Sequence, residues 1–205
     1  MTDGPLSGLG NVHKAKTLLR KNILSRRDSI TPGTRAEKDG KIRERLLALP
    51  VFKKAHTVLF YASFRGEVDT FELMRYFLSK GGTAILPRVN DDRKGMTLFE
   101  IKSPAELAPG YFGVPEPPVS ADLVGDKAAP DLIIVPGVAF DGECNRLGYG
   151  KGFYDKLLRQ KGCAAVALAY EEQIAAAVPH EPHDVRMDMI ITDKGIIERR
   201  GRKED

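Results

Sequence analysis

DLIIVPGVAFDGECNRLGYGKGFYDKLL, residues 131–158, carries the strongest fold signal in this chain. Its first part, 131–135, is a short apolar run that predicts a buried strand. Its last part predicts a helix near 152–160, and a long glycine-rich loop joins the two. A strand that leads through a loop into a helix is the repeating unit of α/β proteins. The stretch therefore predicts an α/β fold.

The same alternation of short apolar runs and amphipathic segments continues on both sides. Further strands are predicted at 57–61, 83–86, 163–169 and 188–192, with an extra strand at 96–101. Helices are predicted over 13–29, from Pro32 to near Leu49, over 70–79 and near 171–177, with Thr31 and Asp69 as caps. We therefore expect an open, mostly parallel sheet with helices on both faces, a Rossmann-like three-layer arrangement with ligands beyond the carboxyl ends of the strands.

Within the first predicted helix, Leu19 and Ile23 share one face and Leu18 and Leu24 flank it. Residues 1–205 are expected to form a single domain, with 1–10 as a loose tail because this segment is rich in Gly and Pro.

Composition excludes several classes of protein. The 205 residues are 42% hydrophobic and 29% charged, which is typical of a globular domain. No apolar run is long enough for a membrane span, and the two cysteines, Cys144 and Cys163, cannot build a disulfide framework. We expect a cytoplasmic monomer without a membrane partner. The net charge of +4 suits anionic small molecules at least as well as nucleic acid, and we expect no nucleic-acid partner.

The glycine-rich loop is the first candidate for chemistry. Gly148, Gly150 and Gly152 alternate with other residues, and Arg146 and Lys151 flank them ahead of a helix. Glycines allow backbone N–H groups to approach an anion, and a helix N-terminus adds positive charge. This pattern favours phosphate binding, although it matches neither the Walker nor the dinucleotide motif. The alternative is a flexible surface loop with incidental charges.

Five charged residues outside this loop are further candidates. Asp155 complements the dipole of the helix that follows the loop or reaches Mg²⁺ beside a phosphate, and Asp184 precedes the last strand. Lys16 and Arg20 share a helix face, which is either a solvated basic surface or a contact to RNA phosphates. Glu67 follows the first strand, where it caps the next helix or binds a polar heterocycle.

Six segments together resemble the 5-formyltetrahydrofolate cyclo-ligase family, also called 5,10-methenyltetrahydrofolate synthetase. They are KTLLRK (16–21), YASFRGEVDT (61–70), LPRV (86–89), FGVPEP (112–117), DLIIVPGVAFDGECNRLGYGKGFYD (131–155) and HDVRMDMIIT (183–192). The resemblance implies conversion of 5-formyltetrahydrofolate to 5,10-methenyltetrahydrofolate with ATP and Mg²⁺, releasing ADP and phosphate. It implies that the formyl oxygen is phosphorylated and that N10 then closes the ring.

The resemblance also implies roles for individual residues. ATP would contact Lys16, Arg20, Arg146, Leu147, Gly148, Tyr149, Gly150, Lys151, Gly152, Phe153 and Tyr154. The catalytic cations would be Lys151 and Arg146, and Mg²⁺ would bind Asp155 and Asp184. The folate would contact Ala62, Glu67, Phe112 and Tyr154. Two positions depart from the family: Phe153 replaces a tyrosine, and Phe112 stands where some members carry tryptophan.

Two other functions stay open at this point. The basic loop and helix would also suit a nucleotide- or RNA-binding module without catalysis, although no RNA-reading aromatic motif is present. A different ATP-dependent enzyme could use the same scaffold. Nucleophilic catalysis is not favoured, because there is no G-x-S-x-G elbow and neither cysteine has an evident histidine partner.

Overall fold

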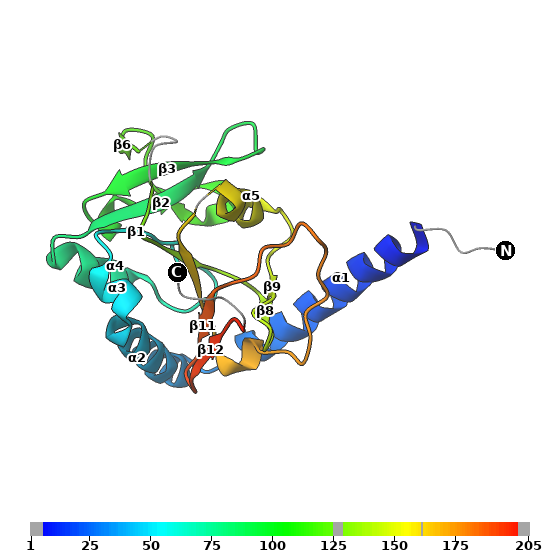
Figure 1. The fold of residues 1–205 in the computed structure, drawn as a ribbon. Helices are drawn as coiled ribbons and strands as arrows, with labels where there is room; N and C mark the ends of the chain where they lie inside the picture. The colour runs from blue at the N-terminus through cyan, green and yellow to red at the C-terminus, as the bar shows by residue number, and fades with distance from the viewer. Residues whose placement is uncertain (1–5, 125–128, 161, 201–205) are drawn as a thin grey trace.

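The computed structural model describes residues 6–124, 129–160 and 162–200 and has the predicted α/β architecture (Figure 1). Within these residues one sheet has the strand order β12-β11-β10-β7-β1-β2-β3-β6. Its strands are β1 (Thr57–Leu59), β2 (Thr83–Val89), β3 (Met96–Ile101), β6 (Asp122–Leu123), β7 (Leu132–Val135), β10 (Ala164–Leu168), β11 (Met189–Ile191) and β12 (Ile196–Glu198). β2, β1, β7, β10 and β11 run parallel, whereas β3 pairs antiparallel with β2, and the edge strands β6 and β12 pair antiparallel with β3 and β11. The prediction of a mostly parallel sheet is confirmed.

Helices cover both faces of this sheet, as predicted. They are α1 (Leu6–Asp28), α2 (Pro32–Ala48), α3 (Pro50–Lys54), α4 (Phe71–Ser79) and α5 (Phe153–Gln160). In β7, Leu132 and Ile134 belong to the apolar cluster that includes α2, α3 and α4, whereas Ile133 and Val135 belong to the cluster that includes α5. Because successive side chains of a strand point to opposite faces, the two clusters lie on opposite sides of the sheet.

Local signals set the starts of two helices. The Thr31 hydroxyl accepts a hydrogen bond from the N–H of Thr34 at 3.3 Å, at the start of α2. The Asp69 carboxylate accepts from the N–H groups of Phe71 and Glu72, each at 3.2 Å, at the start of α4. Both predicted caps are confirmed, and each satisfies backbone donors that a helix leaves without an internal partner.

α1 begins earlier than the sequence predicts. Its first residue is Leu6 and not His13, so the backbone of residues 6–10, which the sequence predicts as part of a loose tail, is helical. Residues 1–5 of that tail lie outside the described residues. Figure 1 shows the first turns of α1 projecting away from the sheet. Within the part of the chain that the structure describes, no helix has the length and apolar character needed to cross a membrane.

The face that α1 packs onto the body agrees with the prediction in part. Ile23 is buried in a small cluster, and Leu19 and Leu24 pack beside it. The partners include the hairpin of β8 (Ala139–Phe140) and β9 (Arg146–Leu147). Leu18, predicted to flank this face, is 61% exposed. Five residues of helix turn it about 140° away from Ile23.

The predicted helix near 171–177 is wrong in extent. Only one 3₁₀ turn forms, Glu171–Gln173 (η3). Beyond it, Ile174 bridges to Phe140, and the N–H of Ala175 donates to the Phe140 carbonyl at 2.8 Å. These bonds to β8 use the backbone groups that a longer helix would need. The turn therefore ends early so that the chain can pack against the β8–β9 hairpin.

Candidate active site

A large cavity lies at the carboxyl ends of β1, β2 and β7. Its volume is about 1560 Å³, and it is lined by α1, by the loop after β1, by residues 111–116 and by the glycine-rich loop. All the predicted site residues line it: Lys16, Arg20, Ala62, Glu67, Phe112, Arg146, Leu147, Gly148, Tyr149, Gly150, Lys151, Gly152, Phe153, Tyr154, Asp155 and Asp184. The fold thus brings together segments that are far apart in the sequence, at the sheet edge where ligands are expected.

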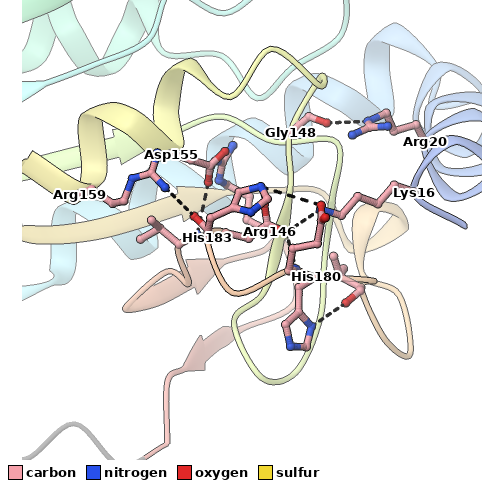
Figure 2. A network of polar contacts seen from close by, with 12 residues as sticks. Lys16, Arg20, Arg146, Gly148, Asp155, Arg159, His180 and His183 are labelled. Atoms are coloured by element: carbon pink, nitrogen blue, oxygen red, sulfur yellow. Dashed lines mark hydrogen bonds and ion pairs between the residues drawn. The ribbon is translucent and has the colours of Figure 1, made fainter. Parts of the chain in front are cut away.

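α1 places Lys16 at one end of this cavity. The side chain is buried, and its ammonium donates to Glu181 at 2.8 Å and to Asp184 at 2.6 Å (Figure 2). Burial alone would raise the pKa of Asp184, but the hydrogen bonds from Lys16 and the backbone outweigh burial, so this pKa is lowered. In the ligand-free protein, Asp184 is therefore a carboxylate paired with Lys16.

One turn later, α1 anchors the glycine-rich loop. Arg20 Nε donates to the Gly148 carbonyl at 2.8 Å (Figure 2). Gly150 has φ +100°, a conformation that residues with a Cβ rarely adopt. Gly148 has a different reason to lack a side chain, because an added Cβ would lie 2.9 Å from Arg146 Nη1. The glycines thus serve both the turn and the close packing of Arg146.

Arg146 is buried beneath this loop and is held on two sides. Its Nη2 donates to Asp155 Oδ1 at 2.7 Å, and its Nη1 donates to the Pro136 carbonyl at 3.3 Å. The Asp155 carboxylate also accepts from the N–H of Val185 at 3.3 Å, next to Asp184. The two predicted metal ligands, Asp155 and Asp184, thus both lie at the segment 184–185. Each forms an ion pair with a basic side chain, Asp155 with Arg146 and Asp184 with Lys16.

Lys151 and Phe112 form the exposed rim. Lys151 Nζ lies 5.9 Å from the centroid of the Phe112 ring. Phe112 is 70% exposed and has φ +55°, an uncommon backbone conformation for a bulky residue. Its edge contacts Tyr111, with ring centroids 4.5 Å apart, and Tyr111 in turn lies 6.5 Å from Phe153. The aromatic ring that was predicted to contact folate is thus on the cavity rim and not in the core.

Glu67, Ala62 and Tyr154 line the inner wall. Glu67 Oε1 accepts a hydrogen bond from the Tyr149 hydroxyl at 2.7 Å, so the folate-side loop touches the glycine-rich loop. Ala62, the residue that follows Tyr61, is buried. Burial raises the pKa of Tyr154, and the charge of Glu67 adds to this rise. The Tyr154 hydroxyl is therefore neutral in the physiological range and available as a donor.

The sequence did not single out several residues that line the same cavity. Glu181 lies three residues before Asp184 and shares the Lys16 ammonium with it. Glu181, His183 and Asp184 have ligand atoms within 4.8 Å of one another. His180 points away toward the Val178 carbonyl, so the two histidines do not converge (Figure 2).

Arg27 and Arg35 were also missed. In the sequence Arg27 is one of two adjacent arginines, and only the helical spacing of 16, 20 and 27 could have placed it on the cavity face. Cys144, by contrast, stays outside the cavity lining. Burial raises the pKa of its thiol to about 11, which does not suit a nucleophile.

Comparisons with known proteins point to one family. The sequence model of the 5-formyltetrahydrofolate cyclo-ligase family matches residues 12–193. The 5-formyltetrahydrofolate cyclo-ligase of Mycolicibacterium smegmatis is 31% identical over 193 residues, which are 90% of this chain and 97% of that protein. The Escherichia coli (strain K12) protein of the same name is 31% identical over 180 residues, covering 86% and 99%. The NMR structure of Aquifex aeolicus 5,10-methenyltetrahydrofolate synthetase has a TM-score of 0.81 at 37% identity, covering 93% and 96%.

Proposed function

The chain belongs to the 5-formyltetrahydrofolate cyclo-ligase family, and we propose that it converts 5-formyltetrahydrofolate to 5,10-methenyltetrahydrofolate with ATP and Mg²⁺. The observation that carries this proposal is the cavity of about 1560 Å³. It exceeds the roughly 300–1,000 Å³ of a usual small-molecule site. Its cationic glycine-rich loop suits a polyphosphate, and Glu67 and Phe112 offer a separate wall for a heterocycle. This size and lining support binding of two substrates at once.

The chemistry requires activation of the formyl oxygen. An N-formyl amide is a poor electrophile, and its oxygen would otherwise leave as hydroxide. Attack of this oxygen on the γ-phosphorus of ATP releases ADP and makes the oxygen part of a phosphate leaving group. N10 then attacks the formyl carbon, phosphate departs with the oxygen, and N10 loses its proton. The protein mainly positions the reactants and stabilises charge.

Arg146 and Lys151 are the cations proposed to stabilise the transferred phosphoryl group. Arg146 is fixed before substrate binds, since Asp155 and the Pro136 carbonyl hold its guanidinium. Preorganised charge of this kind needs no rearrangement at the moment of reaction. Lys151 is exposed and rests near the Phe112 ring. It can therefore swing onto the phosphates when ATP enters.

The carboxylates near the Lys16 end fit Mg²⁺. Asp155 and Asp184 supply hard oxygen ligands, and Mg²⁺ prefers one or two carboxylates together with phosphate oxygens. Asp155 and Asp184 would hold the ion, directly or through water. When bound, Mg²⁺ would neutralise charge on the phosphates of ATP. Lys16 keeps Asp184 ionised until then, and its ammonium has a third N–H for a phosphate oxygen.

The direct test is to mix the protein with ATP, Mg²⁺ and 5-formyltetrahydrofolate and to follow the absorbance of the methenyl product. We expect one ADP and one phosphate per product, and no product when ATP or Mg²⁺ is omitted. Absence of product from the folded protein in the complete mixture would overturn the proposal. It would favour a nucleotide- or RNA-binding module, although the net charge of only +4 predicts weak, salt-sensitive RNA binding.

A separate variant tests the proposal that the glycine-rich loop binds phosphate. Lys151→Ala should lower kcat about 10²–10³-fold, as expected for a lost transition-state contact. The fold should be intact because Lys151 is exposed. Lys21→Ala, an exposed lysine of α1 outside the cavity lining, is the matched control and should keep normal kcat. Normal turnover by Lys151→Ala would remove Lys151 from the catalytic groups.

A further inference from the structure

Arg27 is a buried cation on α1 that the proposed mechanism does not use. It is 2% exposed, whereas its neighbour Arg26 is exposed. Its Nη1 donates to the Tyr149 hydroxyl at 2.9 Å, and its Nη2 donates to the Arg65 carbonyl at 2.8 Å. Burying a charge is unfavourable unless partners compensate it. These contacts therefore need an explanation beyond a solvated basic helix.

The Tyr149 hydroxyl connects Arg27 to Glu67 through two hydrogen bonds. It accepts from Arg27 and donates to Glu67 Oε1 at 2.7 Å. The other carboxylate oxygen, Oε2, accepts from the N–H of Phe64 at 2.9 Å. Both oxygens of Glu67 thus have fixed donors, and the hydrogen-bond chain runs in one direction from guanidinium to carboxylate. Networks of this kind polarise their members and hold one geometry.

The charge of Arg27 also acts on Glu67. Burial raises the pKa of Glu67, whereas the hydrogen bonds from Tyr149 and Phe64 and the charge of Arg27 oppose this rise. The titratable groups that face Glu67 from the surrounding elements are Arg27 of α1, Tyr61 after β1, Tyr149 of the glycine-rich loop, Tyr154 of α5 and Tyr170 after β10, and Arg35 of α2 lies against the neighbouring Gly66. The tyrosines carry no charge near neutral pH, and the cation whose charge opposes the rise in the pKa of Glu67 is Arg27.

We propose that Arg27 is a positioning residue that fixes the Glu67 carboxylate through the Tyr149 hydroxyl, in the charged form that accepts an N–H of the substrate heterocycle. The role of Glu67 toward the heterocycle rests on the proposed function. Because Arg27 is on α1, Tyr149 on the glycine-rich loop and Glu67 on the loop after β1, the same contact ties the nucleotide wall to the folate wall. Arg27 touches neither substrate in this scheme.

The first measurement does not depend on turnover. The carboxyl ¹³C signal of Glu67, assigned by its loss in Glu67→Gln, is followed against pH in protein labelled at glutamate. We expect Glu67 to titrate at higher pH in Arg27→Met than in the wild type, and to be unchanged in the control Arg26→Met. An identical Glu67 titration in Arg27→Met and wild type would overturn the proposal, whether or not the protein converts 5-formyltetrahydrofolate.

The second measurement uses the reaction. Arg27→Met should lower kcat/KM for 5-formyltetrahydrofolate about ten- to a hundred-fold, the loss expected for a hydrogen bond to a charged group. The acid limb of its pH profile should move to higher pH. Arg27→Lys keeps the charge without the two-pronged geometry and should lie between wild type and Arg27→Met. An exposed arginine has no such contact, so Arg26→Met should stay within about two-fold of wild type.

A double-mutant cycle separates positioning from packing. In a Tyr149→Phe background, where the hydroxyl is gone, Arg27→Met should lower kcat/KM much less than it does alone. Full additivity would mean that Arg27 acts on packing and not through Tyr149. If Arg27→Met does not fold, Arg27→Lys and Tyr149→Phe decide the question with the same two measurements. A shifted Glu67 titration in a protein without turnover would leave the contact standing and overturn only the proposed function.

Discussion

Two clusters of identical composition occupy different places in this molecule. In the first, Lys16 lies between Glu181 and Asp184, at 2.8 and 2.6 Å. In the second, Lys38 lies between Glu172 and Asp193, at 2.9 and 2.8 Å. The lysine side chains are 10% and 13% exposed, and hydrogen bonds raise the pKa of both lysines although burial opposes this.

Only the first cluster lines the cavity. The second joins α2 to η3 and to the turn after β11, where Asp193 also accepts from the N–H of Glu171 at 2.8 Å. The chemistry of an ion-pair cluster thus does not reveal whether it serves a ligand or the fold. Its position relative to the cavity does, and the comparison predicts opposite consequences for equivalent substitutions.

The largest difference is expected between Lys16→Met and Lys38→Met. Lys16→Met should lower kcat/KM for ATP about ten- to a hundred-fold, since a hydrogen bond to a charged group is lost. Lys38→Met should leave kcat/KM within about two-fold, because the Lys38 cluster lies outside the cavity lining. It should instead lower the melting temperature. Initial rates against ATP, and thermal unfolding of both variants, check this pair; equal losses of activity would break the comparison.

The magnesium response should separate the two aspartates next. Asp184→Asn should raise the Mg²⁺ concentration for half-maximal rate about ten-fold, in line with losses seen when metal sites are altered. An amide is a poorer ligand than a carboxylate for this hard cation. Asp193→Asn should leave the Mg²⁺ curve unchanged, and Asp155→Asn should resemble Asp184→Asn. Titrations of Mg²⁺ at fixed ATP give the answer. An unchanged curve for Asp184→Asn would reduce Asp184 to a partner of Lys16.

For the free energy of unfolding, we expect the larger effect in the second cluster, the reverse of what we expect for activity. This effect should depend on pH. Burial alone would raise the pKa of Asp193, but hydrogen bonds from Lys38 and the Glu171 N–H outweigh it and lower this pKa. The ionised Asp193 therefore stabilises the fold above its unfolded pKa of about 3.9, and this stabilisation is lost as the pH falls through the lower folded pKa.

Asp193→Asn should accordingly lower the free energy of unfolding by about 1–2 kcal/mol near neutral pH, and the difference should shrink as the pH falls below about 4. Asp184→Asn should lower it less, since its side chain is 18% exposed and that of Asp193 only 7%. Urea unfolding at several pH values measures both. A larger loss for Asp184→Asn would contradict the assignment of the second cluster to the fold.

The smallest effect is expected at Phe112. Its substitution should change the KM for folate only, so it is the reference for the ATP effect of Lys16→Met. Phe112→Ala should raise the folate KM about two- to ten-fold, the equivalent of ~0.5–1.5 kcal/mol of stacking. The ATP KM should not change, in contrast to Lys16→Met, and Phe112→Trp should be tolerated. Because Phe112 is 70% exposed, the melting temperature should stay constant. A lower melting temperature with unchanged KM would mean that the ring serves packing.

The sequence predicted the central fold because its buried strands are continuous apolar runs. β7 and β10 read clearly, and β3 was placed at its observed bounds. The sequence did not predict the edge strands β6 and β12, because Asp122–Leu123 and Ile196–Glu198 are short and largely exposed. Their register depends on neighbours and not on a pattern of their own. Local signals therefore suffice for the core and fail at the margins.

The site was predictable where its residues are contiguous. The glycine-rich loop showed its charges and its glycines within one stretch, but the contacts of Lys16 span 165 and 168 residues and have no local signal. The adjacent pair Arg26 and Arg27 shows the same limit. Arg27 is buried because it lies four residues after Ile23, on the helix face that packs against the body. That orientation is set by tertiary packing.

α1 also has a consequence for how this chain tolerates changes in length. Lys16 and Arg27 are separated by eleven residues, or about 16 Å of helix, and they contact different segments of the cavity lining, Asp184 and Tyr149. A single inserted residue between them would rotate one end by about 100° relative to the other. The surface loop at 90–95, by contrast, lies outside the cavity lining. The length of α1 between Lys16 and Arg27 therefore sets both the distance and the rotation between their contacts. Insertions should be tolerated in the loops but not between these two residues.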